Sequence, residues 1–227
     1  MANQSEFYIG YLPPSPGLRK AIRAIVATLL ALACCVGVVL VVGQNPFANS
    51  TFEFQQYREF RGTLLMSPYP ALWMGEQSPW LLVGQGKHGV NDLVRLDGAQ
   101  VSLTGERISR GEDRMIELRP GSLRMVGAGV RPATVDLGVV QLTGEIVDSK
   151  CYFGVMNPGS GKVHRDCAVR CISGGVPPAL LVRDAAGSAR TVLLANWGSE
   201  LLDHIAEPVT LRGRLDRTGD RLTLHLE

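Results

Sequence analysis

The chain has 227 residues, of which 45% are hydrophobic and 19% are charged. This composition is too apolar for a disordered chain and too weakly charged for a polyelectrolyte. The net charge of +2 arises in residues 1–43, because residues 44–227 hold 20 basic and 20 acidic side chains. A neutral domain argues against nucleic acid as a partner, since phosphate binding requires clustered Lys and Arg.

Residues 24–43 form an apolar stretch without a charged side chain, and we predict a transmembrane helix over residues 21–43. A helix of about twenty residues rises ~30 Å, which matches the hydrocarbon thickness of a bilayer. Three basic side chains precede the stretch, and no Lys or Arg follows it until Arg58. The positive-inside rule therefore predicts a cytoplasmic tail over residues 1–20 and an extracytoplasmic C-terminal part.

An uncleaved signal anchor explains this stretch better than a cleaved signal. A signal peptide has a shorter apolar core, of about 7–15 residues, followed by a small-residue cleavage site. Residues 42–46 offer only a poor cleavage site, and the apolar core continues past Cys34, where a lipoprotein signal would end. We therefore expect a single-pass protein of the inner (cytoplasmic) membrane, with its C-terminal domain in the periplasm of a Gram-negative host.

Beyond a linker predicted at residues 44–51, short β-like runs alternate with Gly and Pro, and long amphipathic helices are absent. The runs form two similar series, each opened by a Gly-bearing strand and carrying a V-x-L-x-G strand near its end. The first series lies at residues 60–64, 80–83, 101–105 and 115–118, and the second at 142–146, 180–182, 209–213 and 222–226. The similarity indicates an internal duplication, with coincidence in β-rich sequence as the alternative.

The expected order in the second unit is three strands, a short helix at residues 199–205 and two more strands, which is typical of an OB-fold. We therefore predict a mainly β protein, in which the transmembrane helix is followed by two small OB-like barrel units. These units would occupy residues 52–126 and 135–227, with a linker at 127–134. Because one fold supports many activities, the barrels alone assign no function.

An insertion at residues 148–178 holds every cysteine outside the membrane stretch and one of the four histidines. Residues 163–172 contain no Gly or Pro and are predicted to form a short helix, ended by two glycines. Three candidate donors are spaced i, i+3 and i+7 and would share one face of this helix, while a fourth arrives from the preceding strand. The candidate metal ligands are Cys151, His164, Cys167 and Cys171.

The cluster has four chemical interpretations. Exported thiols tend to oxidise, so Cys151 could form a disulfide with Cys167 or Cys171 and leave one thiol free. A Cys₃His set also suits zinc, or copper(I) because of its preference for thiolates. Neighbouring Lys and Arg side chains could activate a redox or nucleophilic thiol, although the C-x-x-C motif of oxidoreductases is absent. Inert core cysteines are the fourth interpretation.

Two glycine-rich segments are candidate anion sites. Residues 154–162 nearly match a phosphate loop, but Lys162 neither follows the second Gly directly nor precedes Ser or Thr, so no nucleotide is expected. Residues 84–89, with the sequence GQGKHG, follow an apolar strand and are predicted to form a mobile loop. An anion contact or a stray metal ligand is the alternative for this second segment.

The block GEIVDSKCYFGVMNPGSGKVHRDCAVRCISGGVPP, followed by a β-rich tail, resembles a block of uncharacterised bacterial membrane-anchored proteins with a Cys/His-rich, OB-fold-like exported domain. The resemblance covers about residues 142–227, with a weaker echo in the FYIGY segment at residues 7–11. It implies an exported small-barrel domain, and it brings no catalytic assignment.

These features predict a membrane-anchored accessory or subunit of a redox or metal-handling membrane assembly, with a protein partner. The sequence contains no convincing acid–base pair or nucleophilic triad, which favours a non-enzymatic role. Two alternatives stay open. One is a thiol-redox or metal-dependent enzyme that uses one of the three insertion cysteines, and the other is a structural scaffold with a disulfide-stapled loop.

Overall fold

The computed structural model describes residues 15–43, 50–75, 78–90 and 93–227, which belong to two units, residues 1–47 and residues 48–227. In the first unit, the helix α1 (Pro16–Val42) is long and apolar enough to cross a membrane. The apolar helix expected from the sequence is thereby confirmed.

The helix begins at Pro16 rather than at residue 21, where the sequence placed the start of the membrane segment. The side chain of Ser15 accepts a hydrogen bond from Leu18 N at 3.3 Å, which caps the first turn, and proline is well suited to the first helical position. The last residues of the predicted tail over residues 1–20 are therefore helical, and the rest of that tail lies outside the described residues.

The linker predicted at residues 44–51 lies mostly outside the described residues. Its last two residues belong to the strand β1 (Ser50–Phe52), which pairs antiparallel with β5 (Ala99–Arg110). The predicted linker at residues 127–134 is also shorter than expected, because β7 extends to Ala128 and β8 begins at Thr134.

The first barrel closes in the order β2-β3-β4-β6-β5 and back to β2. Its neighbouring strands are antiparallel, except for the parallel pair β4–β6. The strand β7 (Arg124–Ala128) pairs with β5 outside this closed path. The barrel strands are β2 (Arg58–Leu65), β3 (Ala71–Trp73), β4 (Trp80–Val83), β5 (Ala99–Arg110) and β6 (Asp113–Leu118).

The second barrel repeats this arrangement in the order β8-β9-β10-β12-β11, with β10 and β12 as the parallel pair. Its strands are β8 (Thr134–Asp148), β9 (Pro178–Arg183), β10 (Ala189–Ala195), β11 (Pro208–Thr218) and β12 (Arg221–Leu226). A 3₁₀ helix (Ser199–His204) follows the third strand, and the first barrel has a shorter one (Val94–Leu96) in the same place. Mainly β architecture with two small OB-like units is thus confirmed.

The strand-by-strand match between the two predicted series was wrong. It paired residues 80–83 with residues 180–182, but the first segment is the third strand of its barrel and the second segment lies in β9, the second strand. The sequence missed β3, which is only three residues long, and β10, whose last five residues are all buried and show no alternation.

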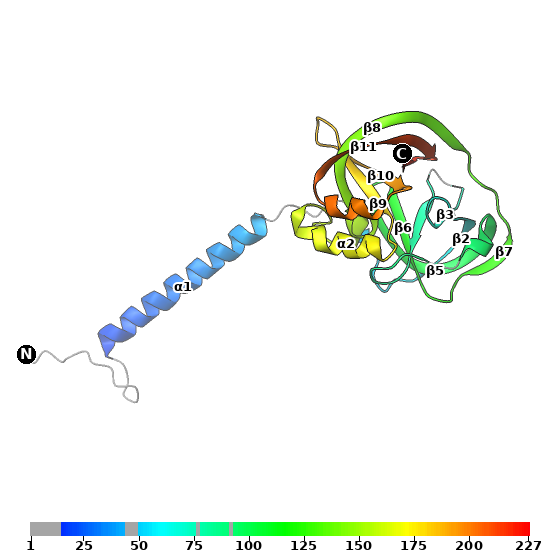
Figure 1. The fold of residues 1–227 in the computed structure, drawn as a ribbon. Coiled ribbons are helices and arrows are strands. Elements are labelled where there is room, and N and C mark those ends of the chain that lie inside the picture. The colour runs from blue at the N-terminus through cyan, green and yellow to red at the C-terminus, as the bar shows by residue number, and fades with distance from the viewer. Residues whose placement is uncertain (1–14, 44–49, 76–77, 91–92) are drawn as a thin grey trace, which may run out of the picture. The chain divides into compact units, whose positions relative to one another are not determined.

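The two barrels share a hydrophobic core. One cluster of buried side chains joins Leu81 and Met115 of the first barrel to Val147 and Leu181 of the second. Figure 1 shows β2, β3, β5 and β7 gathered on one side of this unit, and α2 with β9 and β10 on the other. Side chains of the insertion take part in this shared core, among them the fully buried Phe153. The first turn of the insertion therefore packs into the core that the barrels share, while other parts of the insertion are exposed.

Candidate functional site

The insertion runs from the end of β8 to the start of β9 and consists mainly of three short helices. A π-helix (Cys151–Val155) comes first, then a 3₁₀ turn (Lys162–His164), and then α2 (Arg165–Ser173). Asp148 Oδ1 accepts a hydrogen bond from Cys151 N at 2.8 Å, which fixes the first of these turns. The turn is irregular, because the backbone of Gly154 within it is not helical.

Three thiols meet where the π-helix contacts α2. Cys151 Sγ lies 3.9 Å from Cys167 Sγ and 4.0 Å from Cys171 Sγ. Cys151 and Cys171 are buried, with 3% and 1% of their surface exposed, while Cys167 is half-buried. A disulfide bond is about 2.05 Å long, so these contacts are non-bonded. Within the described part of the chain the cysteines are free and the predicted disulfide is not formed.

The four predicted ligands do not converge on one point. Instead, two groups of donor atoms, each within 4.8 Å, share Cys151: one adds His164 and Cys167, and the other adds Asp148 and Cys171. His164 Nε2 lies 2.8 Å from Asp148 Oδ2, and both side chains are buried. Either group could hold a metal ion. The sequence interpretation missed Asp148, although its position three residues before Cys151 was a usable signal.

Lys87 of the first barrel also reaches the thiols. Its Nζ donates a hydrogen bond to Cys167 Sγ at 2.7 Å and lies 3.9 Å from Cys171 Sγ. The hydrogen bond to Cys167 raises the pKa of Lys87, and the negative charge of the cysteines adds to this effect. Lys87 belongs to the loop at residues 84–89, for which the sequence favoured mobility.

The loop is packed tightly against the end of α2. Gly89 N donates a hydrogen bond to Gly174 O at 2.9 Å, and a Cβ atom at Gly174 would overlap the backbone oxygen of Lys87. Glycine is therefore required at position 174 for the close approach of the two backbones. This contact fixes the loop where its ammonium group faces the thiols.

A buried lysine attaches the same loop to the insertion from the other side. Lys150 Nζ contacts Glu117 Oε2 at 2.5 Å and donates to Gly84 O at 2.8 Å and to Gly86 O at 2.6 Å. Lys150 is only 2% exposed, and these three acceptors match the three donors of an ammonium group. A buried charge requires such complete pairing. The thiol cluster is thus assembled by both barrels.

The thiols differ in their tendency to lose a proton. The contact between Cys151 Sγ and Cys171 Sγ lowers the pKa of Cys171. The same contact raises the pKa of Cys151, and burial raises it further. Cys171 therefore ionises before Cys151, so the cluster can hold one negative charge close to the ammonium group of Lys87.

A thioether completes the outer side of the cluster. Met156 Sδ lies 3.7 Å from Cys167 Sγ, and 43% of the Met156 surface is exposed. The sequence interpretation did not select this methionine, because a single Met gives no motif. Its position one residue beyond the π-helix brings it to the half-buried thiol rather than to the two buried ones.

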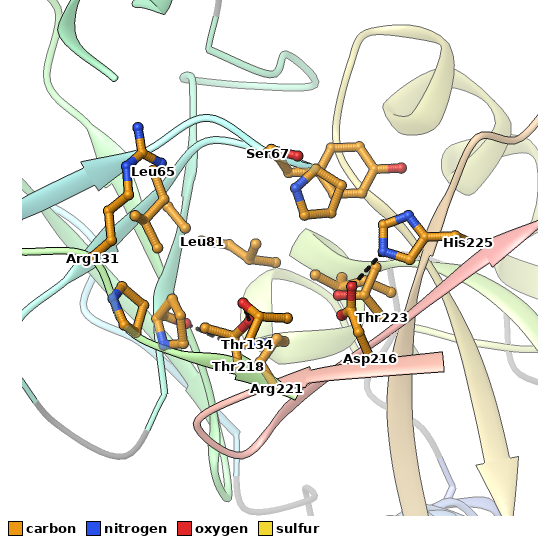
Figure 2. A pocket seen from close by; sticks show the side chains of 16 residues that line it. Leu65, Ser67, Leu81, Arg131, Thr134, Asp216, Thr218, Arg221, Thr223 and His225 are labelled. Atoms are coloured by element: carbon orange, nitrogen blue, oxygen red, sulfur yellow. Dashed lines mark hydrogen bonds and ion pairs between the residues drawn. The ribbon is translucent and has the colours of Figure 1, made fainter. Parts of the chain in front are cut away.

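A cavity of about 260 Å³ also lies between the barrels (Figure 2). Two of its polar side chains have partners: His225 Nε2 lies 2.6 Å from Asp216 Oδ2, and the hydroxyl of Tyr69 accepts a hydrogen bond at 3.0 Å from Trp197 Nε1, which lies outside the lining. Burial raises the pKa of Tyr69 to about 12. The sequence interpretation did not foresee this cavity.

Comparisons with protein-family models, curated proteins and solved structures found no match to this chain. The family resemblance expected from the sequence therefore stays an expectation. Function has to be inferred from the chemistry of the site, because an OB-like fold alone does not specify an activity.

Proposed function

We propose that the protein binds a thiophilic metal ion, zinc or copper(I), through the thiolates of Cys151, Cys167 and Cys171. The Sγ–Sγ distances of 3.9 and 4.0 Å carry this proposal. Metal–sulfur bonds of about 2.3 Å place the sulfurs of a tetrahedral or trigonal site roughly 3.8–4.0 Å apart. Cys151 is thus spaced to share an ion with either Cys167 or Cys171, and binding of all three thiolates to one ion requires Cys167 and Cys171 to move closer together.

The surrounding charges support a thiolate site. A metal bound by three thiolates carries net negative charge, and the ammonium group of Lys87 stands next to two of the sulfurs. His164 offers a further ligand on the side of Cys151 and Cys167, because one of its ring nitrogens lies within 4.8 Å of both sulfurs. The Asp148 carboxylate at its Nε2 leaves Nδ1 for the metal, and such carboxylate–histidine pairs commonly support metal ligands.

The cellular role that we propose is that of a membrane-anchored accessory or subunit of a redox or metal-handling membrane assembly. The apolar helix α1 supports the anchor, and the basic residues at its start support a cytoplasmic N-terminus with the barrels outside the cytoplasm. The neutral charge of residues 44–227 supports a protein partner over nucleic acid. Cysteine labelling at the C-terminus tests this topology, and a cytoplasmic C-terminus would contradict it.

Thiol-disulfide exchange is a second candidate function, favoured by the central place of Cys151 between two sulfurs at similar distances. Oxidation of Cys151 with Cys167 or Cys171 would transfer two electrons to an electron-accepting partner and release two protons. The third cysteine would then stay as a thiolate beside Lys87, able to attack the new disulfide. This candidate needs no metal.

Metal analysis combined with thiol counting separates the two functions. We expect the full chain, purified without oxygen from its membrane, to hold one zinc or copper ion and no disulfide. Cys151→Ser and Cys171→Ser should lose the metal, whereas the control variants Cys34→Ser and Cys35→Ser in α1 should retain it. A metal-free protein with a disulfide within the insertion would contradict the metal proposal. Reversible reduction by a partner would then favour exchange, and an inert disulfide would favour a stapled scaffold.

A further inference from the structure

The sulfur atoms of the site form a continuous path from the surface to the interior. Met156 Sδ lies 3.7 Å from Cys167 Sγ, which lies 3.9 Å from Cys151 Sγ, which lies 4.0 Å from Cys171 Sγ. Exposure falls along this path, from 43% at Met156 to 1% at Cys171. A metal site that only stores its ion would need the buried thiolates but not the exposed thioether of Met156.

We propose that Met156 is the first ligand of an incoming copper(I) ion, which then passes by way of Cys167 to the buried thiolates. This inference rests on the proposed metal site and names both its ion and its route of loading. Thioethers bind copper(I) well, whereas zinc prefers thiolate, imidazole and carboxylate ligands. The exposed Met156 therefore selects copper(I) over zinc during uptake, although the three buried or half-buried thiolates suit both ions.

The transfer is a series of ligand exchanges. In the first, Met156 Sδ displaces one ligand of the chelator or donor protein from copper. In the second, Cys167 Sγ binds and the bond to Met156 Sδ breaks. In the last, Cys151 and Cys171 displace the remaining ligands of the donor, which leaves. Copper stays in the +1 state and no electrons move, and each thiol that becomes a ligand releases its proton to solvent. The ion comes from a copper(I) complex with a soluble chelator or a donor protein. Lys87 balances the charge at Cys167, the sulfur that exchanges with Met156.

Replacing the thioether with a hydrocarbon of similar size tests the route. Met156→Leu keeps the apolar volume but removes the sulfur, and Met125→Leu is the matched control, because Met125 is 60% exposed on β7. The full chain in detergent, reduced and free of oxygen, would receive copper(I) from its bicinchoninate complex. Stopped-flow absorbance follows the rate, and the equilibrium with the chelator gives the affinity.

We expect Met156→Leu to slow copper(I) uptake about tenfold or more, with the affinity changed by less than about threefold. Zinc uptake in this variant, and copper uptake in Met125→Leu, should match the unchanged protein. An unaltered copper rate, an equal slowing of zinc, or a large loss of copper affinity would overturn the inference. If the unchanged protein binds zinc but no copper(I), the inference fails and the metal site stands; if it binds neither ion, the proposed function fails as well.

Discussion

The ammonium group of Lys150 joins the insertion to the first barrel, and its removal should destabilise the whole unit. Lys150→Met keeps the length of the side chain but leaves the buried carboxylate of Glu117 without its cation. It also leaves the carbonyl oxygens of Gly84 and Gly86 without this donor. Breaking a buried ion pair in this way costs about 3–5 kcal/mol. In a domain of this size the melting temperature should fall by about 6–20 °C.

Thermal unfolding of the full chain in detergent, followed by near-ultraviolet circular dichroism, measures this loss. Lys162→Met is the matched control, because Lys162 is exposed on the same insertion, and it should change stability by less than about 0.5 kcal/mol. The double variant Lys150→Met with Glu117→Leu should recover much of the loss, since no buried charge is then left unpaired. A loss below about 1 kcal/mol in the single variant, or no recovery in the double one, would refute the reasoning.

Two further predictions concern the loop and the cavity. Gly174→Ala should lower the free energy of unfolding in denaturant by about 1–3 kcal/mol, because the added methyl group displaces the backbone of Lys87. The same displacement moves Lys87 away from the thiols and should weaken metal binding. In the control Gly127→Ala the methyl group has room, so the free energy of unfolding should change little. Ultraviolet titration should show Tyr69 ionising near pH 12, because burial favours its neutral form. The contribution of neutral Tyr69 to the free energy of unfolding should therefore fall as the pH rises from about 10 to above 12. Tyr69→Phe should abolish this part of the pH dependence. Ionisation of Tyr69 near pH 10 would contradict the prediction.

Local patterns in the sequence gave the main features of the fold. Length and lack of charge predicted an apolar helix, and the cap at Ser15 explains why it starts earlier than expected. Strand-like runs and a short helix predicted OB-like barrels. The strands β3 and β10 escaped prediction, because three residues cannot show alternation and a fully buried strand has none. The error in matching the two series followed directly from these omissions.

The candidate site was predicted only in part, because local sequence patterns show only the contacts between residues close together in the chain. The insertion cysteines lie within about twenty residues of one another, so helical spacing indicated that Cys167 and Cys171 could approach Cys151. The partners Lys87 and Glu117 come from the other barrel, and no local rule connects them with the insertion. The sequence also gave no sign that Asp148 would bond one ring nitrogen of His164.

The amino-acid sequence by itself determined the apolar helix, the barrel type and the gathering of thiols in one insertion, because each depends on residues close together in the chain. Only the tertiary structure decided that part of the insertion packs against both barrels, with an ammonium group from the first facing sulfurs from the second. That arrangement results from packing between segments some 80 residues apart, as between Lys87 and Cys167. Hydrophobic burial drives this packing, but it is not directional, so the sequence pattern does not show which surfaces meet.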